Sequence, residues 1–221
     1  MDIERARFNM VEQQIRPWDV LDQDVLDLLF VVRREEYVPP AYRSLAFTDM
    51  EIPLTVDGVA TGETMLSPKV EARLLQGAEV RRHESVLEFG TGSGYMAALL
   101  GHRARRVLSC ELRPELSAFA SANLGRGGVG NVTVQTGNGL EVADTASWGV
   151  IVLSGSVPFV PETLLQRLEI GGRLIGIVGE LPVMVAQRIT RVGEREFSVD
   201  NLFDTVAQPL SGFPQKEKFR F

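Results

Sequence analysis

The sequence predicts an α/β protein with a mostly parallel sheet, an antiparallel hairpin at one edge and a helical extension at the N-terminus. From residue 85 onward, short apolar runs that favour β-structure alternate with segments of helical periodicity, which is typical of βαβ units. Two consecutive strand-like segments, 183–192 and 196–206, then follow and are joined at Gly193-Glu194. A hairpin after βαβ units predicts an antiparallel edge on a parallel sheet.

The alternation contains seven predicted strands. They cover residues 85–90, 107–111, 132–134, 150–153, 173–178, 183–192 and 196–206. Pro114 and Pro161 stand where two of the intervening helices are expected to begin, because proline suits the first helical position. The expected architecture is therefore a mostly parallel seven-stranded sheet with an antiparallel edge hairpin.

The N-terminal part carries helical patterns in place of this alternation. Residues 3–15 show an imperfect helical stripe, and Asp22 can cap a second helix. The apolar stripe of that second helix comprises Val25, Leu28, Leu29 and Val32. We therefore expect N-terminal helices and a covering loop over residues 1–80, packed on a core formed by residues 81–221.

Residues 58–68 are punctuated by glycines and predict a loop that leads into a helix. Ser67 stands directly before Pro68, the pattern of an N-cap followed by proline at the first helical position. Capping explains this serine without any chemistry. A hydroxyl at the end of such a loop is nevertheless also a candidate catalytic group.

The composition excludes several classes of function. The chain has 23 basic and 29 acidic residues and a net charge of -6, which argues against nucleic acid as the main partner. Its single cysteine, Cys110, cannot form an internal disulfide, and two histidines with one cysteine give no credible zinc site. The polar N-terminus and the lack of a long apolar run predict neither a signal peptide nor a membrane span, so we expect a cytoplasmic protein.

The most informative stretch is the predicted strand that ends in Gly90-Thr91-Gly92-Ser93-Gly94. Alternate glycines let the backbone turn sharply before a helix, and main-chain N–H groups can then approach a ligand closely. Glu88 lies at the end of that strand and is expected to face the same crevice. Glu111 ends the next strand, 19 residues after Gly92, and a carboxylate about 20 residues beyond a glycine turn suits a ribose diol.

Two cofactors fit this glycine turn. Gly92-Ser93-Gly94-Tyr95-Met96-Ala97 also satisfies the motif of nicotinamide and flavin dinucleotides. S-adenosylmethionine is favoured because Glu88 can accept from a cationic amino group and the chain shows no second phosphate-binding feature. A glycine turn that serves packing alone is a third interpretation.

The carboxyl ends of parallel strands meet at one edge of a sheet, where ligands bind. We therefore expect the strand-end residues to converge there, namely Glu88, Gly90, Gly92, Glu111, Asn138 and Ser154. Asn138 has two interpretations of equal weight. It can bind the amino group of an adenine, or it can be a turn residue between Gly137 and Gly139.

Several motifs in order along the chain resemble the protein-L-isoaspartate O-methyltransferase family, and the resemblance covers nearly the whole sequence. They are Met10-Val11-Glu12-Gln13, Arg34-Glu35-Glu36-Tyr37-Val38-Pro39-Pro40-Ala41-Tyr42, Gly62-Glu63-Thr64, residues 87–95 and Gly171-Gly172-Arg173-Leu174-Ile175. The resemblance implies a Rossmann-like class I methyltransferase fold and S-adenosylmethionine as the methyl donor. It also implies transfer to the carboxylate of damaged L-isoaspartyl residues, so the partners are proteins or peptides that carry them, with no nucleic acid and no membrane. The donor-binding residues expected on this basis are Glu88, Phe89, Gly90, Thr91, Gly92, Gly94, Glu111, Leu112, Asn138, Gly139 and Ser154.

The chain departs from the family at the acceptor loop, whose pattern is Gly-Gln-Thr-Ile-Ser-x-Pro. Alignment on Gly62 and Pro68 places Glu63 at the glutamine and Leu66 at the serine that orients the acceptor. Leu66 offers no hydrogen-bond donor, and a Glu63 within ~4 Å would repel a carboxylate by about 1 to 4 kcal/mol. The candidate catalytic residues are Thr64, Leu66 and Ser67, and a hydroxyl from Thr61, Thr64 or Ser67 is expected to replace the missing one.

These departures keep two further hypotheses open. The first is a divergent methyltransferase with another acceptor, and the second is a protein that binds an adenosyl ligand without catalysis. Other changes point the same way, since the family's Gly-Asp-Gly is Gly137-Asn138-Gly139 here and the small end of the fourth strand is Ser154-Gly155-Ser156. The sequence pattern does not decide whether residues 207–221 fold over this site.

Overall fold

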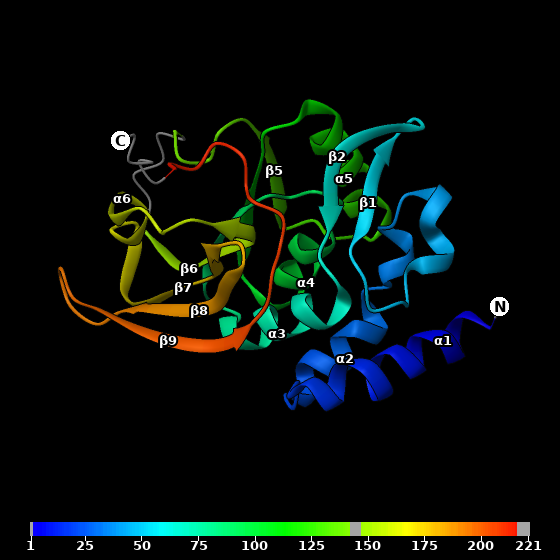
Figure 1. The fold of residues 1–221 in the computed structure, drawn as a ribbon, viewed down its shortest axis with the longest axis horizontal. Coiled ribbons are helices and arrows are strands. Elements are labelled where there is room, and N and C mark those ends of the chain that lie inside the picture. The colour runs from blue at the N-terminus through cyan, green and yellow to red at the C-terminus, as the bar shows by residue number, and fades with distance from the viewer. Residues whose placement is uncertain (1, 142–146, 216–221) are drawn as a thin grey trace.

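A computed structural model describes residues 2–141 and 147–215 of the chain, and its centre is a seven-stranded sheet (Figure 1). The strand order is β5-β4-β3-β6-β7-β8-β9. The strands are β3 (Ser85–Phe89), β4 (Arg106–Glu111), β5 (Val132–Thr136), β6 (Trp148–Val157), β7 (Leu168–Glu180), β8 (Val183–Arg191) and β9 (Phe197–Asp204). The predicted fold is confirmed, including the antiparallel edge, because β8 pairs antiparallel with both β7 and β9.

The order of the strands locates a crevice. The chain starts the sheet at β3, moves outward through β4 and β5, and returns to β6 on the other side of β3. All of these strands pair in parallel. The order reverses between β3 and β6, and in such sheets a crevice for ligands opens beyond the carboxyl ends of the strands at that point.

Successive residues of the central strands pack into two separate cores. Val86 and Val150 belong to the core that also contains residues of α2 (Gln23–Val31), α3 (Pro68–Ala78), α4 (Tyr95–Arg103) and α5 (Pro114–Arg126). Leu87 and Ile151 belong to the core on the opposite face, with residues of α6 (Glu162–Leu165). Because side chains alternate across a strand, strands covered on both faces have continuous apolar runs, which is the pattern that predicted them.

Strands β6 and β7 are longer than their predicted cores, 150–153 and 173–178. The extension of β6 depends on a distant partner, since the backbone N–H of Ser156 donates to the Gln208 carbonyl and the Leu210 N–H donates to the Ser156 carbonyl. A backbone group that finds such a partner stays extended. Local composition at Ser154-Gly155-Ser156 could not predict this pairing.

The N-terminus is helical but irregular. Helix α1 (Ile3–Asn9) continues directly into a π-helical segment, Met10–Ile15, and then a 3-10 turn, Arg16–Trp18. Met10, Val11 and Ile15 are the buried residues of the π segment. Their spacing follows the wider π-helical turn, which explains why the helical stripe at 3–15 is imperfect. Asp22 caps α2 as predicted, since its carboxylate accepts from the N–H groups of Asp24 and Val25.

The loop predicted over residues 58–68 is wrong for most of its length. The structure has an antiparallel hairpin, β1 (Ile52–Val56) and β2 (Val59–Met65), which stands apart from the main sheet and beside α5 (Figure 1). Asp57 and Gly58 make its turn with φ of 50° and 81°. Asp-Gly with two positive φ angles is a strong hairpin signal, and the strands on either side are too polar for an alternating pattern to stand out.

The passage before this hairpin contains two 3-10 helices, Arg34–Glu36 and Pro40–Leu45. Helix α3 ends at Ala78, with Glu79 in the left-handed conformation as its C-cap. The N-terminal elements share one hydrophobic core with the sheet. A division of the chain at residue 80 stays a prediction.

Candidate functional site

The glycine turn between β3 and α4 has the backbone that three glycines allow. Gly90, Gly92 and Gly94 have φ of 85°, 53° and 83°, a conformation that other residues rarely adopt. Gly94 is the N-cap of α4. A Cβ added to it would lie 3.3 Å from the Ala120 carbonyl oxygen and Cβ on α5. The turn therefore packs closely on one side and keeps its backbone open to the crevice on the other.

Glu111 at the end of β4 contacts this turn directly. One carboxylate oxygen accepts from the N–H of Gly92 at 2.9 Å, and the other accepts from the N–H of Arg113 at 3.0 Å. The 19-residue spacing between Gly92 and Glu111 is thus a contact across the ends of adjacent strands. The carboxylate is held rigidly, which suits an acceptor for two adjacent hydroxyl groups.

A cleft of about 210 Å³ opens at the carboxyl ends of β3, β4 and β6. Eight of the predicted donor-binding residues line it, namely Phe89, Gly90, Gly92, Glu111, Leu112, Asn138, Gly139 and Ser154. Thr64 of the hairpin lines it as well. A smaller cavity of about 20 Å³ adjoins it and is lined by Thr64, Leu66, Thr91 and Ser154, among others. The convergence predicted from strand ends is therefore present in the structure.

Glu88 does not line the cleft, contrary to the expectation that it faces the crevice. It is fully buried, and its carboxylate accepts from the hydroxyl groups of Ser109 at 2.6 Å and Ser154 at 2.7 Å. Burial raises the pKa of Glu88 to about 8, against the lowering effect of the two serine hydrogen bonds. The Thr91 hydroxyl lies 2.6 Å from that of Ser109. Glu88 thus ties β3, β4 and β6 together beneath the cleft.

Asn138 behaves as a turn residue. Its side-chain oxygen accepts from the N–H of Leu140 at 3.1 Å, and its amide donates to Glu141 at 3.0 Å. The positive φ at this turn, 132°, belongs to Gly137. Gly139 allows close packing, since a Cβ there would lie 2.6 Å from the Phe89 ring. Asn138 still lines the cleft, so its amide remains within the site.

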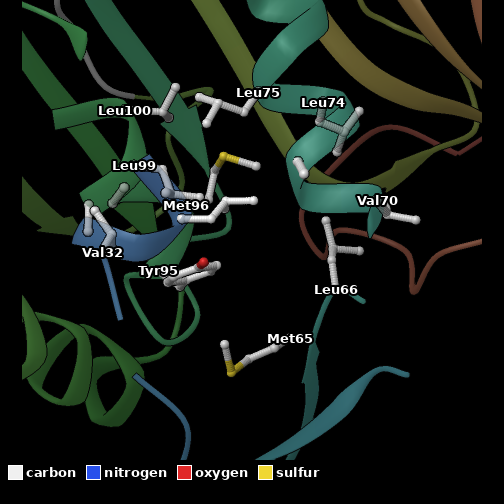
Figure 2. Close-up of a cluster of buried hydrophobic side chains, with 14 of the residues drawn as sticks. Val32, Met65, Leu66, Val70, Leu74, Leu75, Tyr95, Met96, Leu99 and Leu100 are labelled. Atoms are coloured by element: carbon white, nitrogen blue, oxygen red, sulfur yellow. The ribbon is translucent and has the colours of Figure 1, made fainter. Parts of the chain in front are cut away.

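Leu66 is part of the hydrophobic core. Figure 2 shows its side chain in the same cluster as Val70, Tyr95 and Met96, and it is 5% exposed. The Leu66 carbonyl accepts from the Arg34 guanidinium at 2.7 Å. Arg34 also pairs with the buried Glu71, whose pKa burial raises to about 7 against the opposing effect of that pair. A position that holds serine in the family pattern is here an anchor for the base of the hairpin.

The three candidate hydroxyls of the acceptor loop have different surroundings. The Thr61 hydroxyl donates to the Leu54 carbonyl at 2.8 Å and accepts from the Glu63 N–H, so it serves the hairpin. Ser67 has the backbone of an N-cap but makes no side-chain capping hydrogen bond. The Thr64 hydroxyl lies 3.1 Å from a carboxylate oxygen of Glu51 and 3.1 Å from the side-chain oxygen of Gln208. Of the three, Thr64 lines the cleft.

Glu63 pairs with Arg113, whose guanidinium lies 3.1 Å from its carboxylate. The pair raises the pKa of Arg113, chiefly through this hydrogen bond. An ion pair presents a much weaker field than a lone charge, so the repulsion predicted for an unpaired Glu63 is opposed by Arg113. The pair also joins the hairpin to the loop that follows β4, beside Glu111.

The C-terminal segment, residues 205–215, forms part of the site, although no sequence motif predicts a role for it. In Figure 1 this segment is red and runs from the end of β9 back across the molecule. Leu210, Ser211 and Phe213 line the cleft, and the Phe213 ring meets that of Phe89 edge-on at 5.5 Å. Apolar residues at 207, 210 and 213 were the available signal, which is weak because the spacing fits no regular element. Residues 216–221 lie outside the described residues.

The described residues contain no group of three side chains that could hold a metal ion. Within the same part of the chain, no helix has the length and apolar character to cross a membrane.

The fold and the site together define a class of protein, the Rossmann-like proteins that bind an adenosine-containing cofactor at a glycine turn. Comparison with known proteins then gives the family. The family model for Protein-L-isoaspartate(D-aspartate) O-methyltransferase matches residues 5–212, and the chain belongs to this family. The family selects the methyl donor over the dinucleotide that the glycine motif alone left open.

Individual relatives of the chain carry the name of this family. The chain is 36% identical over 211 residues to a protein-L-isoaspartate O-methyltransferase of Koribacter versatilis, across 95% of this chain and 91% of the relative. It is 37% identical over 205 residues to one of Rhodopseudomonas palustris, across 92% of each. A Plasmodium falciparum structure of this kind, in complex with S-adenosyl-L-homocysteine, aligns with a TM-score of 0.74 at 21% identity, across 92% of this chain and 97% of that one. At that identity the likeness concerns the fold.

Proposed function

We propose that this protein transfers a methyl group from S-adenosylmethionine to the free carboxylate of L-isoaspartyl residues in proteins and peptides. The observation that carries the proposal is the family match over residues 5–212 together with the contact between Gly92 and Glu111. The substrate comes from the family's description, and the donor site comes from the geometry. We place the reaction in the cytoplasm, in keeping with a chain that has one cysteine.

The donor fits the cleft by its chemistry. Glu111 offers a fixed carboxylate for the ribose hydroxyls, and Phe89 and Leu112 offer apolar surface for the adenine ring. Gly90 and Gly92 bring backbone close to the rest of the donor. We propose that Asn138, Gly139 and Ser154 complete this wall, and that Glu88, Thr91 and Gly94 hold the turn in shape from below. When bound, the donor supplies a methyl group on a cationic sulfur.

The acceptor needs positioning more than acid or base chemistry. A carboxylate with a pKa near ~4 is already ionised at neutral pH, so the protein has to orient it and exclude water. We propose that Thr64 donates its hydroxyl proton to the acceptor, the role that the serine has in the family pattern. In the structure this hydroxyl faces two acceptors, the Glu51 carboxylate and the Gln208 side-chain oxygen, so it has to turn from these to the acceptor carboxylate. Gln208 itself is fixed by a 2.6 Å hydrogen bond from its amide to the Gly62 carbonyl.

The test is incubation of the purified protein with S-adenosylmethionine and either an isoaspartyl peptide or the same peptide with a normal aspartyl residue. We expect a methyl ester and S-adenosylhomocysteine with the isoaspartyl peptide alone. Thr64→Val is expected to raise KM or lower kcat at least tenfold, while calorimetry shows unchanged binding of S-adenosylhomocysteine. Binding of that product without any ester would reject this acceptor.

A second candidate is methylation of a different acceptor, or binding of the adenosyl ligand without catalysis. Two observations favour it, namely the apolar Leu66 at the serine position and the Glu51 carboxylate beside the Thr64 hydroxyl. Leu66→Ser separates the two candidates. If the parent protein is inactive and Leu66→Ser becomes active on isoaspartyl peptides, the parent has lost this acceptor. If both are inactive while they bind the demethylated donor, another acceptor or a binding role is the simpler account.

A further inference from the structure

A second hollow begins where the donor cleft ends. Thr64 lines the cleft and also lines a groove of about 610 Å³, which runs away from the cleft along the C-terminal segment. Gln208, the hydrogen-bond partner of Thr64, lines the groove as well. The groove is therefore continuous with the place where we propose that the acceptor is held.

The exposed surface of this groove is mostly apolar. Its apolar side chains are those of Pro158 after β6, Leu181 and Met184 around the start of β8, and Val206, Ala207 and Pro209 of the C-terminal segment. Two carboxylates, those of Glu51 and Glu180, line it as well. Met184 is 5% exposed, whereas Leu181 is 73% and Val206 is 55% exposed. Single exposed apolar residues are ordinary, but these two border the same hollow.

The groove is held in shape by backbone hydrogen bonds. The Thr205 N–H donates to the Met184 carbonyl at 3.2 Å, and the Ser156 N–H donates to the Gln208 carbonyl at 2.9 Å. These contacts fix the C-terminal segment against β8 on one side and β6 on the other. A preformed apolar hollow binds an apolar group without first having to be ordered.

We propose that this groove binds the apolar side chain of the residue next to the methylated isoaspartyl residue in the acceptor polypeptide. The inference rests on the proposed function, since it takes Thr64 as the anchor of the acceptor carboxylate. The neighbour on the N-terminal side lies about 3.3 to 3.6 Å further along an extended chain, and the one on the C-terminal side lies one methylene further because the isoaspartyl linkage runs through the side chain. A groove that begins at Thr64 is therefore placed to receive the side chain of a neighbouring residue. A charged side chain would lose water against these walls, and an acidic one would also meet Glu51, which lines the same groove.

The groove predicts a preference for leucine over alanine beside the isoaspartyl residue, which can be measured as a ratio of kcat/KM values. Apolar pockets discriminate by about 10- to 200-fold for each methylene gained or lost. Leucine has three carbons more than alanine, but the groove is open to solvent along its rim, so we expect about tenfold in total, well below what a closed pocket would give for three carbons. An isoaspartyl peptide with leucine beside the modified residue should have a kcat/KM about tenfold above the peptide with alanine there, and the peptide with glutamate should be poorer still.

The experiment compares these three peptides on the full-length protein and on two variants. Val206→Asp places a charge on the groove wall at a half-exposed position, so folding should be unaffected. Val199→Asp is the matched control, because Val199 is 54% exposed on β9 and lies outside the groove. We expect Val206→Asp to lose the preference for leucine and Val199→Asp to keep it, with equal binding of S-adenosylhomocysteine.

Several outcomes would overturn the groove proposal. Turnover with no dependence on the neighbouring residue, or the same leucine preference in Val206→Asp, would do so. So would a change of sedimentation coefficient in Val206→Asp with the preference intact, since the groove would then be a contact between copies. Binding of fluorescent peptides in the presence of S-adenosylhomocysteine separates this proposal from the proposed function. Leucine-dependent binding without turnover supports the groove and rejects the function, whereas absence of both rejects both.

Discussion

Glu111 is the residue with the clearest single role in the donor site. Its carboxylate binds Gly92 and Arg113 through their N–H groups and lines the cleft. Glu111→Ala should weaken binding of S-adenosylhomocysteine more than tenfold, because a lost charge-assisted pair to the ribose costs roughly 1.5 to 3 kcal/mol. Titration calorimetry measures this. Glu115→Ala, at an exposed position four residues on, serves as the control, and an affinity of Glu111→Ala within threefold of the parent would contradict the role.

Glu51 is the residue that least suits a carboxylate acceptor. Its carboxylate lies 3.1 Å from the Thr64 hydroxyl, so an acceptor bound there faces a like charge. Two such charges about 4 Å apart repel by about 1 kcal/mol in water and by more near a protein surface. Glu51→Gln should therefore lower KM for an isoaspartyl peptide by roughly fivefold. The measurement is steady-state kinetics at low salt.

Glu4→Gln is the control for Glu51→Gln, because it changes the net charge equally at an exposed N-terminal position. An unchanged KM in Glu51→Gln would mean that the acceptor carboxylate lies away from Glu51, and a higher KM would mean that Glu51 helps to hold the acceptor. Either result would contradict the expected repulsion.

At the scale of elements, the β3–α4 turn combines a ligand-binding backbone with tight packing. Gly94 and Gly58 have nearly the same φ, 83° and 81°, but a Cβ at Gly94 would meet Ala120 while one at Gly58 would meet open space. The left-handed conformation costs an alanine about 1 to 2 kcal/mol. We expect Gly58→Ala to lose about that much stability and Gly94→Ala to lose more. Urea unfolding measures both, and equal losses would contradict the role assigned to Ala120.

The two hairpins differ in how well the sequence predicts them. The β8–β9 hairpin was predicted because two strand-like runs stand next to each other, and the structure confirms it. The β1–β2 hairpin was missed although Asp57-Gly58 marks its turn, because Glu63 and Thr64 interrupt the apolar pattern. Those same polar residues contact Arg113 and Gln208, so the pattern was broken by residues of the site itself.

At the scale of the whole molecule, two buried acids couple folding to pH. Burial raises the pKa of Glu88 to about 8 and that of Glu71 to about 7, from an ordinary value of 4.5. The folded state therefore holds protons that the unfolded state has released between about pH 4.5 and 8. Their stabilising contribution is complete below about pH 4.5 and is lost as pH rises through 7 to 8.

We therefore expect the Tm to fall between pH 5 and pH 8.5, and Glu88→Gln to reduce that fall. Differential scanning calorimetry across this range checks both, with Glu162→Gln as a control at an exposed position. A Tm that rises with pH, or an equal fall in Glu88→Gln, would mean that Glu88 is ionised in the folded protein. Glu88 lies beneath the cleft and accepts a hydrogen bond from Ser154, so its ionisation places a negative charge directly below the donor site.

The sequence by itself determined the order of strands and helices from residue 85, the antiparallel edge and the glycine turn with its distant carboxylate. These features depend on local periodicity, on backbone angles that glycine allows, and on the rule that parallel strands end together. Such signals lie within about 20 residues of one another. They were sufficient to predict the fold and the place of the ligand, whereas the choice of S-adenosylmethionine over a dinucleotide also needed the resemblance of motifs along the whole chain.

Only the tertiary structure decided which side chains line the site. It buried Glu88 beneath the cleft, paired Glu63 with Arg113, placed Leu66 in the core and brought the C-terminal segment over the donor site. The Thr64 hydroxyl and Gln208 are 144 residues apart in the chain and 3.1 Å apart in space. Contacts of this kind depend on how separate elements pack. No local sequence pattern predicts them, because each partner alone is an ordinary polar residue.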